Sequence, residues 1–326
     1  MKIVVYSFME LERPCYAGLE EELGVELVFC PEPPTMQSAL RAQGAQAVSV
    51  VTTPVDAALI DEFYRLGVRY ISTRNVGYDH IDVEHAWQVG MGVGNAGYQP
   101  NNVAEYAVML ILMSTRKGAV IDRAYQKQDY SLAGKMGTML KGSTVGVVGT
   151  GKIGRTVIQL LSGFGCHILA YDPFPSDETA ACAEYVDLST LLRQSDVITL
   201  HAPRTEESYH LIDRAAIAEM KPGVILVNTA RGALVDTEAL IEGLESGKIG
   251  YAALDVLEGE TPVYYKNFEG QPIPLEAIEK LSRLPNVLLT PHTAFYTRQA
   301  IFEMVRNSIT SCVREMRGEA NPWKIV

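Results

Sequence analysis

The sequence lacks any apolar run long enough to cross a membrane and any cysteine pair with the spacing of a metal site. Its longest apolar stretch, Tyr106–Met113, is far shorter than the roughly 20 residues of a spanning helix. The five cysteines are an odd number without paired spacing, so we expect free thiols in a reducing compartment. The N-terminal segment Met1–Tyr6 lacks the apolar core of a secretory signal. We therefore expect a cytoplasmic protein without a bound metal.

Basic residues are also scarce relative to acidic ones. The chain has 28 Lys and Arg against 39 Asp and Glu, a net charge of -11 and a pI of about 5.1. Such a surface repels phosphate backbones and anionic lipids, which argues against a nucleic-acid or membrane partner. A small anionic substrate remains compatible with it, because one arginine can dominate a small site. The 326 residues favour about two domains, and neither a repeat nor a low-complexity linker interrupts them.

Short apolar runs alternate with helical patterns in two successive series. The first series predicts strands at Ile3–Tyr6, Glu26–Phe29, Ala47–Val51, Tyr70–Thr73 and Met91–Val93. The second predicts strands at Val145–Val148, His167–Tyr171, Val197–His201, Val224–Asn228, Tyr251–Asp255 and Val287–Thr290. Strands that alternate with helices indicate parallel sheets covered by helices. We therefore expect an α/β chain of two Rossmann-like, doubly wound domains.

A long helix from Asn101 to Lys117, capped by Asn101 or Asn102, separates the two series. The last helix, Thr297–Arg317, has only a short tail and is expected to return to the first domain. The predicted domains are residues 1–100 plus 297–326, and residues 101–296.

The glycine pattern at the start of the second series predicts a dinucleotide site. Gly149, Gly151 and Gly154 fit G-x-G-x-x-G directly after an apolar strand and before a helix. This context gives weight to a pattern that is weak alone, because the glycines allow a tight turn, close backbone approach to a pyrophosphate and close helix packing. Asp172 ends the next strand, at the position expected for a carboxylate that accepts from the ribose 2′-OH. No Lys or Arg occurs between Asp172 and Leu192, so we expect NAD rather than NADP.

Three charged residues follow later strands, where an open α/β sheet places its ligand site. Arg231 enters a glycine turn, Glu260 follows another turn, and His292 follows a strand and a proline. Each has an ordinary explanation alone: an ion-paired loop arginine, a solvated carboxylate or a structural histidine. Together they provide a carboxylate anchor in Arg231 and a proton donor in His292, which Glu260 would keep protonated. This set predicts reduction of 2-oxo acids by hydride transfer.

The sequence resembles the D-isomer-specific 2-hydroxyacid dehydrogenase family over nearly its whole length, most closely the D-lactate dehydrogenase branch that includes the vancomycin-resistance type. The segments that carry the resemblance occur in the family's order: Arg74–Asp82, Gly149–Gly154, Tyr171–Pro173, Asn228–Asp236, Asp255–Glu260 and Pro291–Tyr296.

The resemblance implies an active site in the cleft between a substrate domain and an NAD-binding domain, the first and second predicted domains. Arg231, Glu260 and His292 would be the catalytic set, Val76 and Gly77 would bind the substrate carboxylate, and Tyr98 would line the pocket. The other residues implied to contact NAD are Lys152, Ile153, Ala202, Pro203, Thr229, Ala230, Arg231 and Asp255. Lys152 and Ala202 depart from the residues usual in relatives. The family is usually dimeric, through the helix that corresponds to Asn101–Lys117.

The most favoured reaction is reduction of pyruvate to D-lactate, and the substrate side chain stays open. Tyr98, Phe295 and Tyr296 could surround a methyl or a larger group, so branched and aromatic 2-oxo acids remain alternatives. A second class of function is an NADH-sensing corepressor on the same fold. That class is disfavoured because the chain is compact and has neither a peptide-binding cleft nor added tails.

Overall fold

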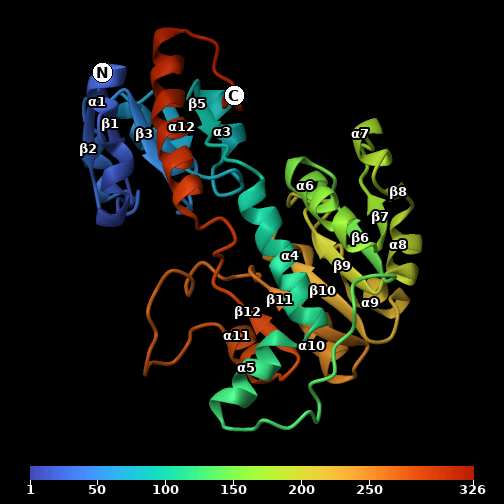
Figure 1. Cartoon of the computed structure of the whole chain (residues 1–326). Coiled ribbons are helices and arrows are strands. Elements are labelled where there is room, and N and C mark those ends of the chain that lie inside the picture. The colour runs from blue at the N-terminus through green and yellow to red at the C-terminus, as the bar shows by residue number, and fades with distance from the viewer. The chain divides into compact units, whose positions relative to one another are not determined.

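Two parallel sheets, each with its own helices, organise the chain (Figure 1). The computed structural model describes residues 1–326. Its contacts divide the chain into two units: unit 1 is Met1–Gln99 with Tyr296–Val326, and unit 2 is Pro100–Phe295. No helix in either unit is both long enough and apolar enough to span a bilayer.

Unit 1 contains a five-stranded sheet in the order β2-β1-β3-β4-β5, in which every neighbouring pair is parallel. Its strands are β1 (Lys2–Val5), β2 (Glu26–Phe29), β3 (Ala47–Val50), β4 (Tyr70–Thr73) and β5 (Gly92–Asn95). Its helical segments are η1 (Glu10–Tyr16), α1 (Leu19–Leu23), η2 (Ser38–Ala42), α2 (Ala57–Arg65), α3 (Val83–Val89) and α12 (Arg298–Arg317). Separate buried clusters lie on its two faces, one with α2 and α3 and the other with η1, α1 and α12.

The last helix, α12, is fixed to the unit 1 sheet by buried hydroxyl groups. Ser308 Oγ lies 2.8 Å from Ser49 Oγ and 2.9 Å from Ser72 Oγ. Tyr70 OH lies 2.8 Å from Ser311 Oγ. Small side chains let the helix approach the strands closely, and the hydroxyls hydrogen-bond to one another.

A buried ion pair lies at the carboxyl end of β4. Arg74 is 1% exposed and Glu12 of η1 is 5% exposed, with 3.9 Å between Arg74 Nη2 and Glu12 Oε2. The guanidinium also donates to the backbone oxygen of Tyr6 at 2.8 Å and to Ser49 Oγ at 3.1 Å. Arg74 thus joins the ends of three strands to η1, and its charge is balanced by one carboxylate.

Unit 2 contains a seven-stranded sheet in the order β12-β11-β10-β9-β6-β7-β8, again parallel throughout. Its strands are β6 (Thr144–Val148), β7 (His167–Tyr171), β8 (Glu184–Tyr185), β9 (Val197–Leu200), β10 (Val224–Asn228), β11 (Ile249–Leu254) and β12 (Val287–Leu289). Its helical segments are α4 (Asn101–Thr115), α5 (Gly118–Gln126), α6 (Lys152–Leu161), η3 (Ser162–Phe164), α7 (Asp177–Ala180), α8 (Leu188–Gln194), α9 (Arg214–Glu219), η4 (Gly232–Leu234), α10 (Thr237–Glu245) and α11 (Glu276–Arg283).

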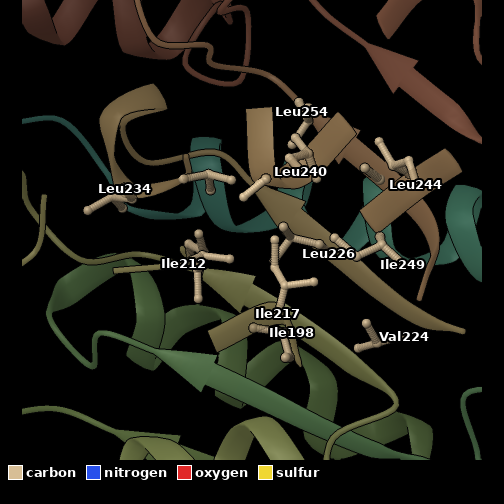
Figure 2. Close-up of a cluster of buried hydrophobic side chains, with 14 of the residues drawn as sticks. Ile198, Ile212, Ile217, Val224, Leu226, Leu234, Leu240, Leu244, Ile249 and Leu254 are labelled. Atoms are coloured by element: carbon tan, nitrogen blue, oxygen red, sulfur yellow. The ribbon is translucent and has the colours of Figure 1, made fainter. Parts of the chain in front are cut away.

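Helices cover both faces of the unit 2 sheet, so successive residues of each strand are buried on opposite sides. Ile198 and Leu226 point into the cluster that α8, α9 and α10 cover (Figure 2). Val197 and Val227 point into the other cluster, which α4 and α6 cover. This arrangement explains why the strands are continuous apolar runs in the sequence.

Two doubly wound parallel sheets confirm the predicted α/β class. The predicted cap of α4 was wrong: the residue before its first turn is Pro100, and no side chain caps the helix. Asn101 and Asn102 are the first two residues of the helix itself, so neither occupies the position from which a side chain caps a helix. The two-residue strand β8 was not predicted, because so short a strand has no recognisable alternation.

Removal of the Glu12 carboxylate should destabilise unit 1, because it leaves the Arg74 charge buried and unbalanced. We expect Glu12→Ala to lower the free energy of unfolding by about 3 kcal/mol. Glu10→Ala is the matched control, since Glu10 belongs to the same segment and pairs with Arg13 in solvent; its loss should cost less than about 1 kcal/mol. Equilibrium urea unfolding measures both, and equal midpoints for the two variants would contradict a structural role for the buried pair.

Candidate active site in unit 2

The predicted site residues of unit 2 follow the carboxyl ends of its strands and therefore lie along one edge of the sheet. The strand order reverses between β6 and β9, whose chain neighbours lie on opposite sides. Ligands of open α/β sheets bind at such a switch point. The glycine loop follows β6, and Ala202 and Pro203 follow β9. These two segments therefore lie on either side of the switch point.

The glycine loop after β6 is shaped by contacts that a side chain would prevent. A Cβ at Gly154 would lie 1.9 Å from the backbone oxygen of Gly149. Gly149 has φ +90°, and a Cβ there would lie 2.6 Å from the backbone nitrogen of Ala202. Gly151 precedes α6 and faces open space. The loop thus leaves room at the N-terminus of α6, where unpaired N–H groups and the helix dipole favour a pyrophosphate.

Asp172 lies beside this loop at the end of β7. Its Oδ2 accepts from Thr150 N at 2.7 Å, and its Oδ1 accepts from Phe174 N at 2.9 Å. These bonds hold the half-buried carboxylate next to the glycine loop, where the sequence predicts a ribose acceptor. Oδ2 also accepts from Thr150 Oγ1 at 3.2 Å, so Oδ1 is the oxygen that keeps a further lone pair for a ligand hydroxyl.

The other residues implied to contact NAD are distributed around the same loop and the end of β10. Lys152 and Ile153 open α6, with Lys152 exposed and Ile153 half-buried. The Thr229 hydroxyl is buried without a hydrogen-bond partner. A buried hydroxyl without a partner is costly, and a bound cofactor could satisfy it. The glycine cradle, Asp172 and this hydroxyl together fit a dinucleotide.

Arg231 follows β10 in a turn that packs closely against the loop after β11. A Cβ at Gly232 would lie 2.0 Å from the carbonyl carbon of Leu257 and 2.2 Å from Glu258 N, so only glycine allows this approach. Asn228 Nδ2 donates to the Arg231 carbonyl at 2.9 Å, and Arg231 Nη1 donates to the Ala230 carbonyl at 2.8 Å. Glycine and asparagine therefore hold the arginine turn against the segment that carries Glu260.

Glu260 and His292 form a close pair. His292 Nδ1 lies 2.5 Å from Glu260 Oε1, and the side chains are 26% and 19% exposed. The second carboxylate oxygen accepts from Leu257 N at 2.6 Å. His292 Nε2 has no partner within the chain, so one ring nitrogen is held by the carboxylate and the other is available to a substrate. An imidazole with one nitrogen bound to a carboxylate and the other open has the arrangement of a general acid–base pair.

The loop that carries His292 is held by the buried carboxylate of Asp255, which is 0% exposed. Asp255 Oδ1 accepts from Thr290 Oγ1 at 2.6 Å and from Thr293 N at 2.9 Å, and its Oδ2 accepts from Ala294 N at 2.9 Å. His292 itself has φ +52°, a conformation that costs energy for a non-glycine residue and persists where surrounding bonds impose it. Asp255 therefore positions the histidine.

A second histidine on the same edge differs from His292 in its environment. His201 follows β9, and its Nδ1 is buried without a partner. Burial lowers the pKa of His201 to about 3, because the low-dielectric surroundings disfavour the imidazolium. A neutral imidazole cannot supply a proton as imidazolium at pH 7, so His292 remains the candidate acid.

The predicted site residues of unit 1 lie at the carboxyl edge of its own sheet and beside α12. Val76 and Gly77 follow Arg74, and Asn95 Nδ2 donates to the Val76 carbonyl at 2.7 Å. The N–H groups of Val76 and Gly77 donate to no other group of the chain. Tyr98 follows β5 and is half-buried, and Tyr296 precedes α12 and is 48% exposed.

Sequence reasoning missed the residues that hold the histidine loop from outside. Tyr265 OH donates to the His292 carbonyl at 3.0 Å, and Tyr106 OH lies 3.1 Å from Thr293 Oγ1. The side chain of Asp255, implied to contact NAD, is directed at the histidine loop. A buried aspartate at the end of an apolar strand was the one available signal for this role, since its partners lie more than thirty residues away.

Replacement of Asp255 by asparagine should loosen the histidine loop, because an amide NH₂ would face N–H donors. We expect Asp255→Asn to lower the free energy of unfolding by at least about 2 kcal/mol. Asp236→Asn is the matched control: Asp236 caps α10 by accepting from Glu238 N and Ala239 N, and asparagine caps helices equally well. Thermal unfolding of both variants tests this. An Asp255→Asn variant as stable as Asp236→Asn would contradict the clamp.

Comparison with known proteins agrees with this geometry. Residues 108–294 match the family described as D-isomer specific 2-hydroxyacid dehydrogenase, NAD binding domain. The chain is 41% identical to the D-specific alpha-keto acid dehydrogenase of Enterococcus faecium, over 95% of this chain and 96% of that protein. It is 37% identical to the D-lactate dehydrogenase of Escherichia coli over the whole of both chains.

A solved structure gives the same result. The D-lactate dehydrogenase from Treponema pallidum superposes with a TM-score of 0.88 at 35% identity, and the match covers 100% of both chains. This likeness extends through both units, and the family match covers the glycine loop, Asp172, Arg231, Glu260 and His292. With the resemblance confirmed, the chain belongs to the NAD-dependent D-isomer-specific 2-hydroxyacid dehydrogenase family.

Proposed function

We propose that the chain reduces pyruvate, and 2-oxo acids of the same kind, to the D-2-hydroxy acid with His292 as proton donor. The observation that carries the proposal is the Glu260–His292 pair, with Nδ1 held at 2.5 Å and Nε2 left available. In the overall reaction a 2-oxo acid, NADH and one proton give the 2-hydroxy acid and NAD⁺. NADH, when bound, supplies the hydride that becomes the hydrogen on C2.

The residues of the chain bind the substrate and move the proton. Arg231 would bind the carboxylate and polarise the C2 carbonyl, because a guanidinium offers two parallel donors. The available N–H groups of Val76 and Gly77 would bind the same carboxylate, and Tyr98 would lie against the substrate. His292 would donate the Nε2 proton to the developing alkoxide, while Glu260 stabilises the imidazolium.

These residue roles assign the cofactor and the substrate to different units. Unit 2 would hold NAD through the glycine loop, Asp172 and the loops after β9 and β10, and unit 1 would hold the substrate. Five unpaired cysteines are compatible with the reducing cytoplasm.

We also propose a homodimer. The helix expected to form the interface, α4, buries most of its side chains within unit 2, and Met109 is 38% exposed. The segment that follows exposes large apolar side chains, which monomers rarely leave to solvent: Ile121, Tyr125, Tyr130, Leu132, Met136 and Met139. Sedimentation velocity tests this, and a monomer at micromolar concentration would reject it.

The direct test of the function is NADH oxidation in the presence of pyruvate, with chiral chromatography of the product. We expect stoichiometric NAD⁺ and D-lactate. Absence of NADH oxidation with any 2-oxo acid, or formation of L-lactate, would overturn the proposal.

The carboxylate of Glu260 should govern the pH dependence of reduction. Without it the imidazolium loses the negative charge beside it, so Glu260→Gln should move the basic limb of the kcat/KM profile to lower pH. Reduction at neutral pH should suffer more than oxidation of the hydroxy acid at higher pH, because oxidation needs neutral imidazole. His292→Ala should lose activity at every pH.

A second Glu–His pair on the same loop supplies the matched control. Glu258 Oε2 lies 2.8 Å from His210 Nε2, and Glu258→Gln should leave the profile unchanged. The measurement is kcat/KM against pH, for reduction of the 2-oxo acid and for oxidation of the hydroxy acid, in the native chain and the three variants. An unmoved limb in Glu260→Gln, or the same displacement in Glu258→Gln, would reject the proposed pairing.

Asp172 should determine the choice of cofactor. Asp172→Ala removes a charged acceptor for the ribose hydroxyl, so KM for NADH should rise about tenfold. It also removes the repulsion of a 2′-phosphate, so the ratio of kcat/KM for NADH to that for NADPH should fall. Asp177→Ala removes an exposed carboxylate nearby and serves as the control. Steady-state kinetics with both cofactors measure the effect, and unchanged KM values for both in Asp172→Ala would exclude this role.

A further inference from the structure

A cavity of about 440 Å³ lies in unit 2 at the amino edge of its sheet. It is bounded by the end of α4, by the loop before β6 and by the first residues of β9, β10 and β11. The candidate active site of unit 2 lies at the opposite, carboxyl edge. Strands β10 and β11, of five and six residues, run from one edge to the other over about 17 Å. A small molecule in this amino-edge cavity therefore cannot reach the residues of the active site.

The loop before β6 forms one wall of the cavity and is held against α4. Thr138 N donates to the Thr115 carbonyl at 2.8 Å, and a Cβ at Gly137 would lie 2.5 Å from the same oxygen. The residues on either side of this contact, Met136 and Met139, line the cavity and are 86% and 76% exposed. Methionine side chains adapt to partners of irregular shape, so this wall fits an apolar group.

Strand β11 enters the cavity with a β-bulge. Its pairing with β10 changes register there, which leaves residue 250 as an extra residue between two paired positions. The residue is Gly250, and a Cβ at this position would lie 2.6 Å from the Gly223 carbonyl oxygen. Bulges re-aim nearby side chains and are frequent beside functional sites. The side chain that follows this bulge is Tyr251, which lines the cavity.

The hydroxyl of Tyr251 is a hydrogen-bonding group without a partner. Tyr251 is 4% exposed, and its OH is buried and makes no hydrogen bond within the chain. Burial raises the pKa of Tyr251, so the hydroxyl keeps its proton at neutral pH and can donate it. An unpartnered buried hydroxyl is costly, and an acceptor bound in the cavity would remove that cost.

The charges that line the cavity favour a negatively charged ligand. Lys221 Nζ lies 2.8 Å from Asp196 Oδ1, so these two charges balance each other. Lys117 has φ +52°, which is uncommon for a non-glycine residue, and its Nζ donates to the Gly134 carbonyl at 3.2 Å. Its charge has no carboxylate partner, in a chain whose net charge is -11. Lys117 and Tyr251 are thus two donors that suit a carboxylate.

We propose that the amino-edge cavity is a second ligand site, which binds a small organic acid. Its carboxylate accepts from Lys117 and Tyr251, and its apolar body lies against Met136 and Met139. A volume of about 440 Å³ is within the range of cavities that bind small molecules. The inference is independent of the proposed function, because it requires neither NAD nor a reaction at C2.

The test is isothermal titration calorimetry with 3-phenylpropanoate and with its neutral amide, 3-phenylpropanamide. Saturating NADH and oxamate, an analogue of pyruvate, occupy the active site throughout, so that the acid cannot bind there. We expect the native chain to bind the acid with a Kd below about 1 mM. The amide has nearly the same shape without the charge and should bind at least about tenfold more weakly.

Two variants test the residues that would bind the carboxylate. Tyr251→Phe removes a hydroxyl that has no partner in the chain, so it should fold normally and weaken binding of the acid about fivefold. Lys117→Met removes the charge from a side chain of similar length and should weaken binding about tenfold. The matched controls are Tyr264→Phe, which removes another unpartnered buried hydroxyl of unit 2, and Lys280→Met, at an exposed lysine of α11. Both controls should leave the Kd unchanged.

Three results would each overturn the inference. They are absence of binding to the native chain, equal affinity for the acid and the amide, and a Kd that neither Tyr251→Phe nor Lys117→Met changes. A cavity that a second copy of the chain fills would give the first of these results.

Discussion

The geometry of the unit 2 site depends on one buried carboxylate, that of Asp255. It terminates β11 and accepts hydrogen bonds from Thr290, Thr293 and Ala294, which surround His292 on the next strand's loop. These bonds impose a left-handed conformation on His292 and turn its Nδ1 toward Glu260. The acid–base pair is therefore a consequence of how two neighbouring parallel strands end, and the loop's own residues would not adopt this conformation alone.

In unit 1 a buried ion pair, rather than a single carboxylate, holds a loop at the end of a strand. Arg74 ends β4 and donates to the strand ends around it, and Glu12 balances its charge. A buried ion pair is costly to desolvate, so its presence is weak support for stability. Its effect here is positional: it connects η1 to the residues before Val76, which lie at the same edge. In both units a buried charge at a strand end fixes a loop that carries predicted site residues.

The sequence predicted much of the fold because parallel strands covered on both faces are continuous apolar runs. The residues that bear the proposed chemistry were also predictable, since Arg231, Glu260 and His292 each follow such a run at a glycine or proline. Contacts between residues that are far apart in the sequence could not be predicted. Glu12 and Arg74 are far apart in sequence, as are Asp255 and Thr293, and no local pattern indicates that one will meet the other. The cap of α4 was mispredicted for a local reason, because the helix already includes Asn101 and Asn102 and the residue before it is Pro100.

The reaction is easier to infer from the sequence than the substrate is. The chemistry requires charged groups in a fixed order, and charged residues next to glycines are recognisable in a sequence. A pocket for an apolar group needs only apolar surfaces of suitable shape, and the sequence of any core helix also provides these. Leu11 and Phe302 differ from core residues only in being exposed around a hollow, a property that belongs to the folded chain.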